Sequence, residues 1–379
     1  MKQLVKQGLD QAYEITKRSL ADFTGGFPTT YTTENIYGKE TNYEWTPGFY
    51  TGYVWLLNEY KEDAAFLEVL QEHIRSFRER IDQKICTETH DLGFLYSLSC
   101  VAAYKLTGDE FAKETALIAA DELAIRFREK GQFIQAWGSL DAPNNYRLII
   151  DCLLNLPLLY WATEVTGDTK YNHIAYTHLK TCLSHIIRED ASTYHTFYFN
   201  YEDGTPSHGV THQGYKNDST WSRGQAWGIY GIALSYAYTK DESLIKPFKE
   251  VTKYFIEHLP KDYIPYWDFT FKEGDEPRDS SAAAIAVCGM LEMKKYIDDQ
   301  EYCSELDHYI ESIMSSLITN YAAKTEDETN GLLYKGTYAR KSPYNSCDDY
   351  GVNECVLWGD YFYVEALMRM YNPDWKMYW

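Results

Sequence analysis

The sequence predicts an all-helical protein in which helical hairpins follow one another as a ring or solenoid. Two observations carry this prediction: almost uniformly apolar runs alternate with charged amphipathic runs, and a short acidic turn recurs between them. A helix that is apolar on all sides lies inside other helices, whereas an amphipathic helix covers them. Together with a first run, Gln3 to Leu20, and a last run, Asn353 to Tyr371, we expect about twelve paired helices.

The individual elements follow in order along the chain. The runs expected to form inner helices include Leu92 to Leu106, Cys152 to Val165, Ala226 to Tyr238 and Ser281 to Met293. Outer helices follow the turns, as in Glu110 to Arg128, where apolar residues recur at three-to-four spacing among Lys, Glu and Arg. The turns are Lys61-Glu62-Asp63, Thr107-Gly108-Asp109, Thr166-Gly167-Asp168, Thr239-Lys240-Asp241 and Asp298-Asp299, and we expect their aspartates to be N-caps.

Composition narrows the class of protein. Lys+Arg 36 against Asp+Glu 56 in 379 residues leaves a net charge of −20, which repels nucleic acid. No apolar run approaches the ~20 residues that cross a bilayer, and Met1 to Lys17 has no signal-peptide core, so we expect no membrane partner and a cytoplasmic location. The eight cysteines form no CxxC pair, so neither disulfides nor zinc are expected. An aromatic content of 16% exceeds what a core needs, and a carbohydrate cleft is one place where the additional rings are useful.

Polar and aromatic residues recur at the start of each expected inner helix, 17 to 19 residues before the next turn wherever such a turn follows. They are Trp45, His90-Asp91, Arg147 with Asp151, Trp221 with Arg223 and Trp227, Arg278-Asp279, and Trp358 with Asp360. If the hairpins close around an axis, these clusters meet at one mouth and form a pocket. Any single aspartate of this kind, such as Asp91 or Asp279, is more often an ordinary helix N-terminal residue stabilised by the helix dipole.

Asp91 and Asp151 begin neighbouring inner helices, so we expect them to face each other. A carboxyl group whose pKa is raised by burial and by a neighbouring charge holds a proton near neutral pH and is a general acid. Asp151 lies within an apolar run, where an unpaired carboxylate is costly, so catalysis is favoured there; for Asp91 a structural role is equally possible.

Further residues surround the expected mouth. The segment Tyr194 to Gln213 is expected to be an aromatic loop or hairpin over it, and Gly209 makes a metal site of His208 and His212 unlikely on a helix. Arg223 is a candidate two-hydrogen-bond clamp for a carboxylate. Trp45, Trp137, Trp221 and Trp227 offer flat faces for sugar rings, although a tryptophan is more often a core residue. No Walker, GxGxxG or HExxH motif is present.

At these residues the whole chain resembles the unsaturated glucuronyl hydrolases of glycoside hydrolase family 88. The motifs are TNYEWTPGF (41–49), HDLGFLYSLS (90–99), QAWG (135–138), IIDCLLNLPLL (149–159), YHTFYF (194–199), THQG (211–214), STWSRGQAWGIYG (219–231), RDSSA (278–282) and LWGDYFYVEAL (357–367). The resemblance implies a single (α/α)6 toroid over residues 1–379 without a cofactor. It also implies a cytoplasmic enzyme that acts on oligosaccharides left by polysaccharide lyases.

The resemblance further implies a reaction and roles. Such enzymes remove 4,5-unsaturated glucuronic acid from the non-reducing end by hydrating its C4=C5 enol ether, so the carboxylate-separation rule of other glycosidases does not apply. Asp151 matches the residue that protonates C4 and activates water, and Asp91 the second acid. His195, Gln213 and Arg223 match groups that bind the uronate, and Trp45, Trp137 and Trp227 match the aromatic walls.

One stretch departs from the family members that favour sulfated substrates. Where those have Ser and Lys, this chain has Asp348, Asp349 and Tyr350, and acidic groups there are expected to repel sulfate. This weakly favours unsulfated disaccharides. The alternative activities are an unsaturated rhamnogalacturonyl hydrolase, with the same chemistry on a galacturonate-derived residue, and a non-catalytic glycan-binding toroid, which has no need of Asp151. No oligomeric state is predicted.

Overall fold

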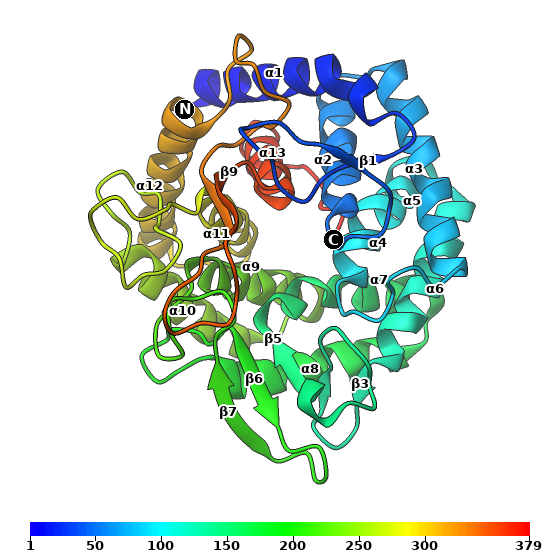
Figure 1. Ribbon diagram of the computed structural model, residues 1–379, viewed down its shortest axis with the longest axis vertical. Helices are drawn as coiled ribbons and strands as arrows, with labels where there is room; N and C mark the ends of the chain where they lie inside the picture. Colours follow the sequence, from blue (N-terminus) through cyan, green and yellow to red (C-terminus); the bar gives the residue numbers. More distant parts are fainter.

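The helices form a closed double ring in the computed structural model, which describes all residues, 1–379 (Figure 1). The inner helices are α2 (Pro47–Tyr60), the continuous run α4–η2–α5 (Leu92–Tyr96, Ser97–Val101, Ala102–Thr107), α7 (Leu156–Thr166), α9 (Ser222–Thr239), α11 (Ser280–Lys294) and α13 (Leu357–Tyr371). The outer helices are α1 (Lys2–Ser19), α3 (Ala64–Asp82), α6 (Glu110–Ile125), α8 (Thr169–Ile186), α10 (Ile245–Glu257) and α12 (Gln300–Ser316). Because α13 packs against both α2 and α11, the ring closes and the predicted (α/α)6 toroid is confirmed.

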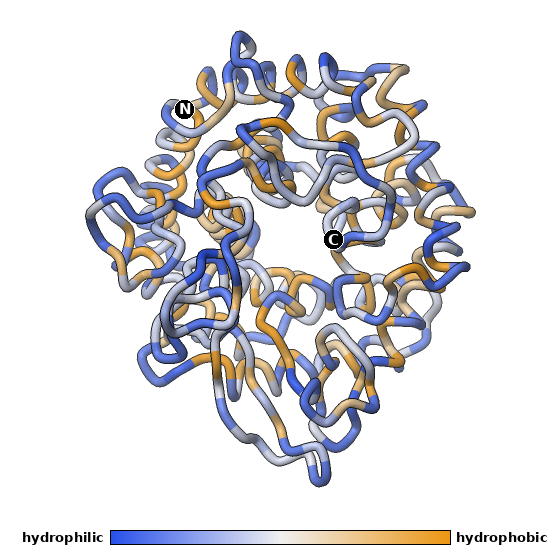
Figure 2. The backbone as a smooth tube through the Cα atoms, in the orientation of Figure 1, coloured by the Kyte–Doolittle hydropathy of each residue, from blue (hydrophilic) through white to orange (hydrophobic).

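The hydrophobic core fills the space between the two layers of helices. It comprises 105 buried residues that run from Val5 to Trp379, and the inner helix α9 is buried from Ser222 to Tyr236. Hydrophilic residues gather on the outermost loops (Figure 2). None of the helices combines the length and apolar character that a membrane crossing requires.

The predicted N-caps at the acidic turns are confirmed. The side chains of Asp63, Asp109, Asp168, Asp241 and Asp299 each accept a hydrogen bond from a backbone N–H in the first turn of the following helix. Asp91 and Asp279 also occupy N-cap positions, at the opposite ends of inner helices, but their side chains make no cap bond. These two carboxylates are therefore not used as helix caps.

Three predicted helix boundaries differ from the structure. The last helix begins at Leu357, because residues before it form strand β9, and α6 ends at Ile125, because Phe127–Arg128 forms strand β3. The expected inner helix from Cys152 begins only at Leu156, with Pro157 in its first turn. Residues Ile150–Leu154 form a 3-10 turn instead, so Asp151 precedes the helix and does not lie within it.

Short antiparallel strands lie in the connections between helices. They are β1 (Phe27–Pro28) with β2 (Lys39–Glu40), β3 (Phe127–Arg128) with β4 (Phe133–Ile134), β5 (Arg147–Ile149) with β6 (Thr196–Phe199) and β7 (Pro206–Val210), and β8 (Gly336–Ala339) with β9 (Tyr350–Glu354). In β6–β7, Thr196 pairs with Val210, so the aromatic segment predicted over the mouth is a hairpin.

Candidate active site

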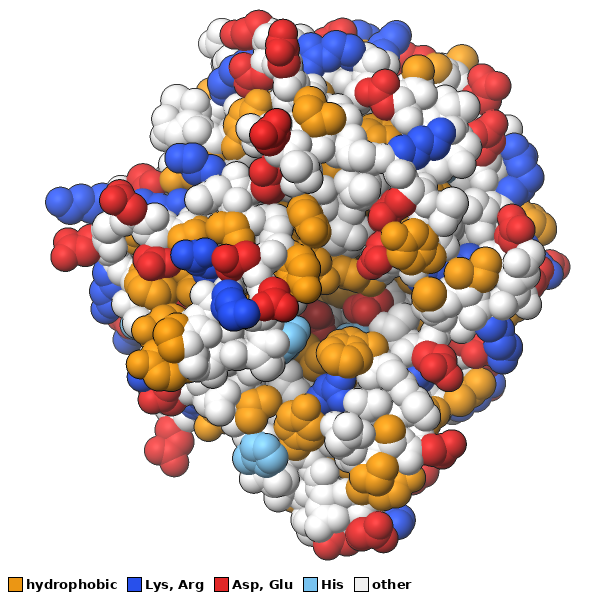
Figure 3. Space-filling view, viewed as in Figure 1, with side chains coloured by type: hydrophobic (Ala, Val, Ile, Leu, Met, Phe, Trp, Pro, Cys, Tyr) orange, Lys and Arg blue, Asp and Glu red, His pale blue; other side chains and the backbone are white.

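A cavity of about 580 Å³ opens at the mouth of the ring, and acidic side chains lie in the central hollow (Figure 3). All eight residues to which the family resemblance gives a role line it: Trp45, Asp91, Trp137, Asp151, His195, Gln213, Arg223 and Trp227. They come from the starts of α2, α4, α7 and α9 and from the connections between helices. The structure therefore brings together residues that are up to 182 positions apart in the chain.

The expectation that all six inner-helix ends meet in the pocket is wrong for two of them. Arg278-Asp279 at α11 and Trp358 with Asp360 at α13 do not line the cavity. The hairpin β8–β9 follows α12 and contributes Tyr338 to the wall. Trp358 supports the site from behind, since its ring lies 4.9 Å from that of Trp45. Asp360 is buried and accepts hydrogen bonds from Tyr37 Oη and Leu333 N.

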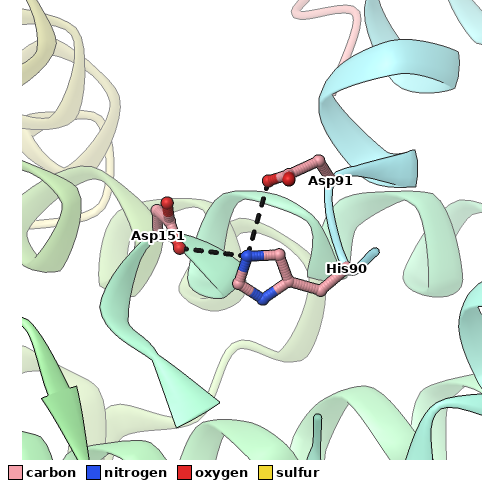
Figure 4. Close-up of side chains that lie close together, drawn as sticks. All are labelled: His90, Asp91 and Asp151. Atoms are coloured by element: carbon pink, nitrogen blue, oxygen red, sulfur yellow. Dashed lines mark ion pairs between the residues drawn. The ribbon is translucent and has the colours of Figure 1, made fainter. Parts of the chain in front are cut away.

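Asp91 and Asp151 converge on the imidazole of His90 (Figure 4). His90 Nε2 lies 3.3 Å from Asp151 Oδ1 and 3.4 Å from Asp91 Oδ1. The hydroxyl of Thr89 donates to the other oxygen of Asp91 at 2.6 Å. Asp151 Oδ1 is buried and accepts no hydrogen bond from the protein. The predicted pairing of the two carboxyl groups is therefore present, with His90 between them.

A close backbone approach fixes the distance between the two acids. A Cβ on Gly93 would lie 2.3 Å from Asn155 Cα, so only glycine permits the contact between α4 and the 3-10 turn. Asn155 Oδ1 accepts a hydrogen bond from Phe94 N at 2.7 Å. Asp91 lies two residues before Gly93 and Asp151 four residues before Asn155, so this contact locks the two acid-bearing segments together.

Burial separates the acidities of these groups. It raises the pKa of Asp91 to about 6, a rise that the Thr89 hydroxyl and the charges of Arg126 and Arg80 limit. Burial, and then the charge of Asp91, raise the pKa of Asp151 well above its usual range. Burial also lowers the pKa of His90 to about 3, so its imidazole is neutral. Near neutral pH, Asp151 holds a proton beside an ionised Asp91, which is the arrangement of a general acid.

The proposed carboxylate clamp of Arg223 is not available as predicted. Its Nη1 donates to Asp279 and to Thr337 O, and its Nη2 donates to Gln213 Oε1 at 2.9 Å and to Tyr338 O at 2.6 Å. All four N–H groups of the two terminal nitrogens thus have protein acceptors. Arg223 is 1% exposed and lies over the Trp221 and Trp358 rings, so it supports the wall and lends positive charge to it.

The three predicted aromatic walls differ in exposure. Trp137 is 48% exposed, and the Arg147 guanidinium lies 4.1 Å from its ring, so it offers an open face at the rim. Trp45 is half-buried and donates from Nε1 to Tyr338 Oη at 3.2 Å. Trp227 is 1% exposed and packs on Phe94, so it forms the floor rather than a platform.

Two further histidines, His195 and His212, supply polar groups to the cavity wall. His195 Nδ1 lies 2.6 Å from Thr196 Oγ1, and its ring lies 4.8 Å from that of Trp221. Burial lowers the pKa of His195 well below its usual value, so the ring is neutral. His212 Nδ1 lies 2.9 Å from Ser346 Oγ. Neutral imidazoles beside Gln213 suit the hydroxyl and carboxylate oxygens of a uronic acid.

Sequence reasoning placed His90 in a cluster at the expected mouth but gave it no role, and it did not nominate Tyr338 as a site residue. His90 carried a signal, since it directly precedes Asp91, but a lone histidine at a helix start is usually structural. Tyr338 carried none, because its strand reaches the cavity only through the fold of β8–β9.

His90, Asp91 and Asp151 are also the one group of three potential metal ligands, with one atom from each within 4.8 Å of the others.

Comparisons with known proteins agree with this geometry. The sequence profile of Glycosyl Hydrolase Family 88 matches residues 19–369. The chain is 46% identical over 380 residues to an unsaturated chondroitin disaccharide hydrolase of Streptococcus pneumoniae, covering 100% of this chain and 94% of that protein. It superposes with TM-score 0.96 at 44% identity on the unsaturated glucuronyl hydrolase of Streptococcus agalactiae, covering 100% and 94%. A variant of that enzyme complexed with dGlcA-GalNAc6S matches with TM-score 0.88 at 40% identity, with the same coverage.

Proposed function

The chain belongs to glycosyl hydrolase family 88. We propose that Asp151 and Asp91 catalyse the hydration reaction that releases an unsaturated glucuronic acid, and that this reaction takes place in the cavity. The protein is a glycoside hydrolase of the unsaturated glucuronyl type, and its substrates are oligosaccharides that end in a 4,5-unsaturated uronic acid. The observation that carries the assignment of roles is the shared contact of both carboxyl groups with His90 in an aromatic-walled cavity.

Asp151 is the proton donor. Its pKa is raised further than that of Asp91 because the charge of Asp91 adds to the effect of burial, so it retains its proton where Asp91 is ionised. The C4=C5 bond of the substrate is an enol ether, and its π electrons take the proton at C4. Positive charge then develops on C5 and the ring oxygen, where the carboxylate of Asp91 stabilises it.

Water completes the addition. The carboxylate left on Asp151 accepts a proton from the water that attacks C5, which regenerates the acid and forms a hemiketal. Opening of this hemiketal gives a ketone at C5 and a hydroxyl on C1. The C1 centre then collapses to an aldehyde and releases the remaining sugar as an alcohol, so no nucleophile attacks C1.

The acidic stretch near the mouth does not carry the net negative charge that the sequence suggested. Asp348 Oδ1 lies 2.6 Å from Lys341 Nζ, and Asp349 Oδ2 lies 2.9 Å from Arg340 Nη1. The four charges cancel, which removes the reason to expect repulsion of sulfate. The structure thus gives no basis for the preference for unsulfated disaccharides that the sequence suggested.

The test is a panel of lyase products followed by ultraviolet absorbance, because hydration destroys the conjugated double bond. We expect unsaturated chondroitin disaccharides to lose their absorbance and the unsaturated rhamnogalacturonan disaccharide to react more slowly. A faster loss of absorbance with the rhamnogalacturonan disaccharide would favour the alternative activity, that of an unsaturated rhamnogalacturonyl hydrolase. No loss on any uronic-acid disaccharide would refute the proposed function.

A further inference from the structure

Two arginines beside the active site are buried without an ion-pair partner. Arg80 is 1% exposed and Arg126 is 4% exposed, and no carboxylate lies within 4 Å of either guanidinium. A buried charge without a counter-ion is costly, so a specific use of each is to be expected. Both lie at the C-terminal ends of outer helices, α3 and α6, where a cation also meets the negative end of the helix dipole.

Arg80 holds the segment that leads into Trp45. Its five N–H groups all donate, to the carbonyl oxygens of Tyr43, Glu44, Ile85 and Cys86 and to Asn42 Oδ1, at 2.7 to 3.2 Å. The acceptors on residues 42–44 directly precede Trp45. Those on residues 85–86 precede the segment with His90 and Asp91. One side chain thus ties an aromatic wall to the catalytic segment.

Arg126 holds the loop of Trp137 in the same way. It donates to the carbonyl oxygens on both sides of Trp137, those of Ala136 and of Gly138, the latter at 2.8 Å, and to Gln135 O at 3.0 Å. Gly138 N in turn donates to Glu88 O at 2.9 Å. The Trp137 loop is therefore also tied to the segment that carries Asp91.

Both arginines act on the charge of Asp91. The titratable groups around its carboxylate are His90 at 3.4 Å, Asp151 within 4.8 Å, Arg80 from α3, Arg126 from α6, Tyr338 from β8 and Cys152 from the 3-10 turn. Of these, Arg80 and Arg126 are the two that lower its pKa by charge. The positive charge of Arg223 is instead paired with Asp279.

We propose that Arg80 and Arg126 are positioning residues of the hydration reaction, which anchor the loops of Trp45 and Trp137 and stabilise the ionised carboxylate of Asp91. This proposal rests on the proposed function, because it assumes that Asp91 reacts as an anion. Substitution separates the anchoring role from the electrostatic role of each arginine. A lysine at either position keeps the positive charge and loses most of the hydrogen bonds, whereas a glutamine loses the charge as well as most of the hydrogen bonds.

The experiment measures kcat and KM against pH, with unsaturated chondroitin disaccharide as substrate, for Arg80→Gln, Arg80→Lys, Arg126→Gln and Arg126→Lys. In the glutamine variants we expect the acid limb of kcat/KM to move up by about half a pH unit or more. In the lysine variants we expect KM to rise several-fold while the acid limb stays near that of the wild type.

Arg18→Gln is the matched control. Arg18, exposed at the end of α1, donates in the same manner to the carbonyl oxygens of Thr325, Asp327 and Thr329, far from Asp91, so its loss leaves the acid limb unchanged. An acid limb that does not move in either glutamine variant would overturn the proposal. If a glutamine variant does not fold, the lysine variant at the same position decides instead, and a wild-type KM together with a wild-type pH profile in that variant would also overturn the proposal. Inactivity of the wild type would refute the proposed function instead.

Discussion

An oxygen of Asp91 and an oxygen of Asp151 lie within 4.8 Å of each other and share one neighbour, Nε2 of His90. Two acids this close do not ionise together, so one proton stays on the pair over the pH range between their two ionisations. Because Asp151 accepts no hydrogen bond at Oδ1 and Asp91 accepts one from Thr89, we expect the proton on Asp151. This asymmetry supports the proposed roles of Asp151 as the acid and of Asp91 as the anion that assists it.

Replacing Asp151 with Asn removes the transferable proton at nearly constant volume. We expect Asp151→Asn to fold as the wild type and to hydrate the unsaturated bond at least ~10²-fold more slowly. Loss of ultraviolet absorbance measures the rate, and circular dichroism measures the fold. Asp168→Asn is the control, because asparagine also caps a helix and Asp168 lies at an exposed turn. Unchanged turnover in Asp151→Asn would remove the mechanism.

The pH dependence of kcat/KM should be bell-shaped. Below about pH 6 Asp91 is protonated, so the rate should rise as pH increases through that value. At higher pH Asp151 loses its proton, and the rate should fall again. Both midpoints belong to the coupled pair rather than to single residues. A profile without an acid limb would contradict the requirement for an ionised Asp91.

Arg223 and Asp279 form a buried ion pair, with side chains 1% and 0% exposed. Removing one partner leaves an unpaired buried charge, which costs about 3–5 kcal/mol. We therefore expect Arg223→Met to lower thermal stability strongly, and Arg223→Met/Asp279→Leu to recover part of the loss. Thermal unfolding of the single and double variants measures this coupling. A large increase in KM for Arg223→Met with wild-type stability would instead support the predicted role of Arg223 as a carboxylate clamp.

Trp137 and Trp227 should respond differently to replacement by alanine. Trp137 is at the exposed rim, so Trp137→Ala should raise KM about 3- to 10-fold and change stability by less than ~1 kcal/mol. Trp227 is buried in the floor, so Trp227→Ala should destabilise the protein by about 3–5 kcal/mol. Steady-state kinetics and thermal unfolding of both variants measure these effects. Equal losses of stability in the two variants would contradict the assignment of Trp137 to the exposed rim and of Trp227 to the buried floor.

Sequence patterns correctly predicted those structural elements that depend on residues close together in the chain. Apolar runs and acidic turns identified the inner helices and the N-caps, because capping depends on a few neighbouring residues. Sequence reasoning missed the start of α7 and the strand before α13, because a 3-10 turn over Ile150–Leu154 and pairing of β9 with β8 override helical periodicity. It also assigned the starts of α11 and α13 to the pocket, whereas Tyr338 of the β8–β9 hairpin lines the cavity and they do not.

The amino-acid sequence by itself determined the helical ring through its periodicity, and its family motifs indicated the class of reaction and eight of the residues that line the cavity. Tertiary structure alone decided what those residues contact. That Arg223 is already bound to Asp279, that His90 stands between two acids and that Arg80 and Arg126 have no counter-ion all depend on side chains from distant segments. The physical reason is that hydrogen bonds and charges act over a few ångströms in space, a separation that spacing along the chain does not encode.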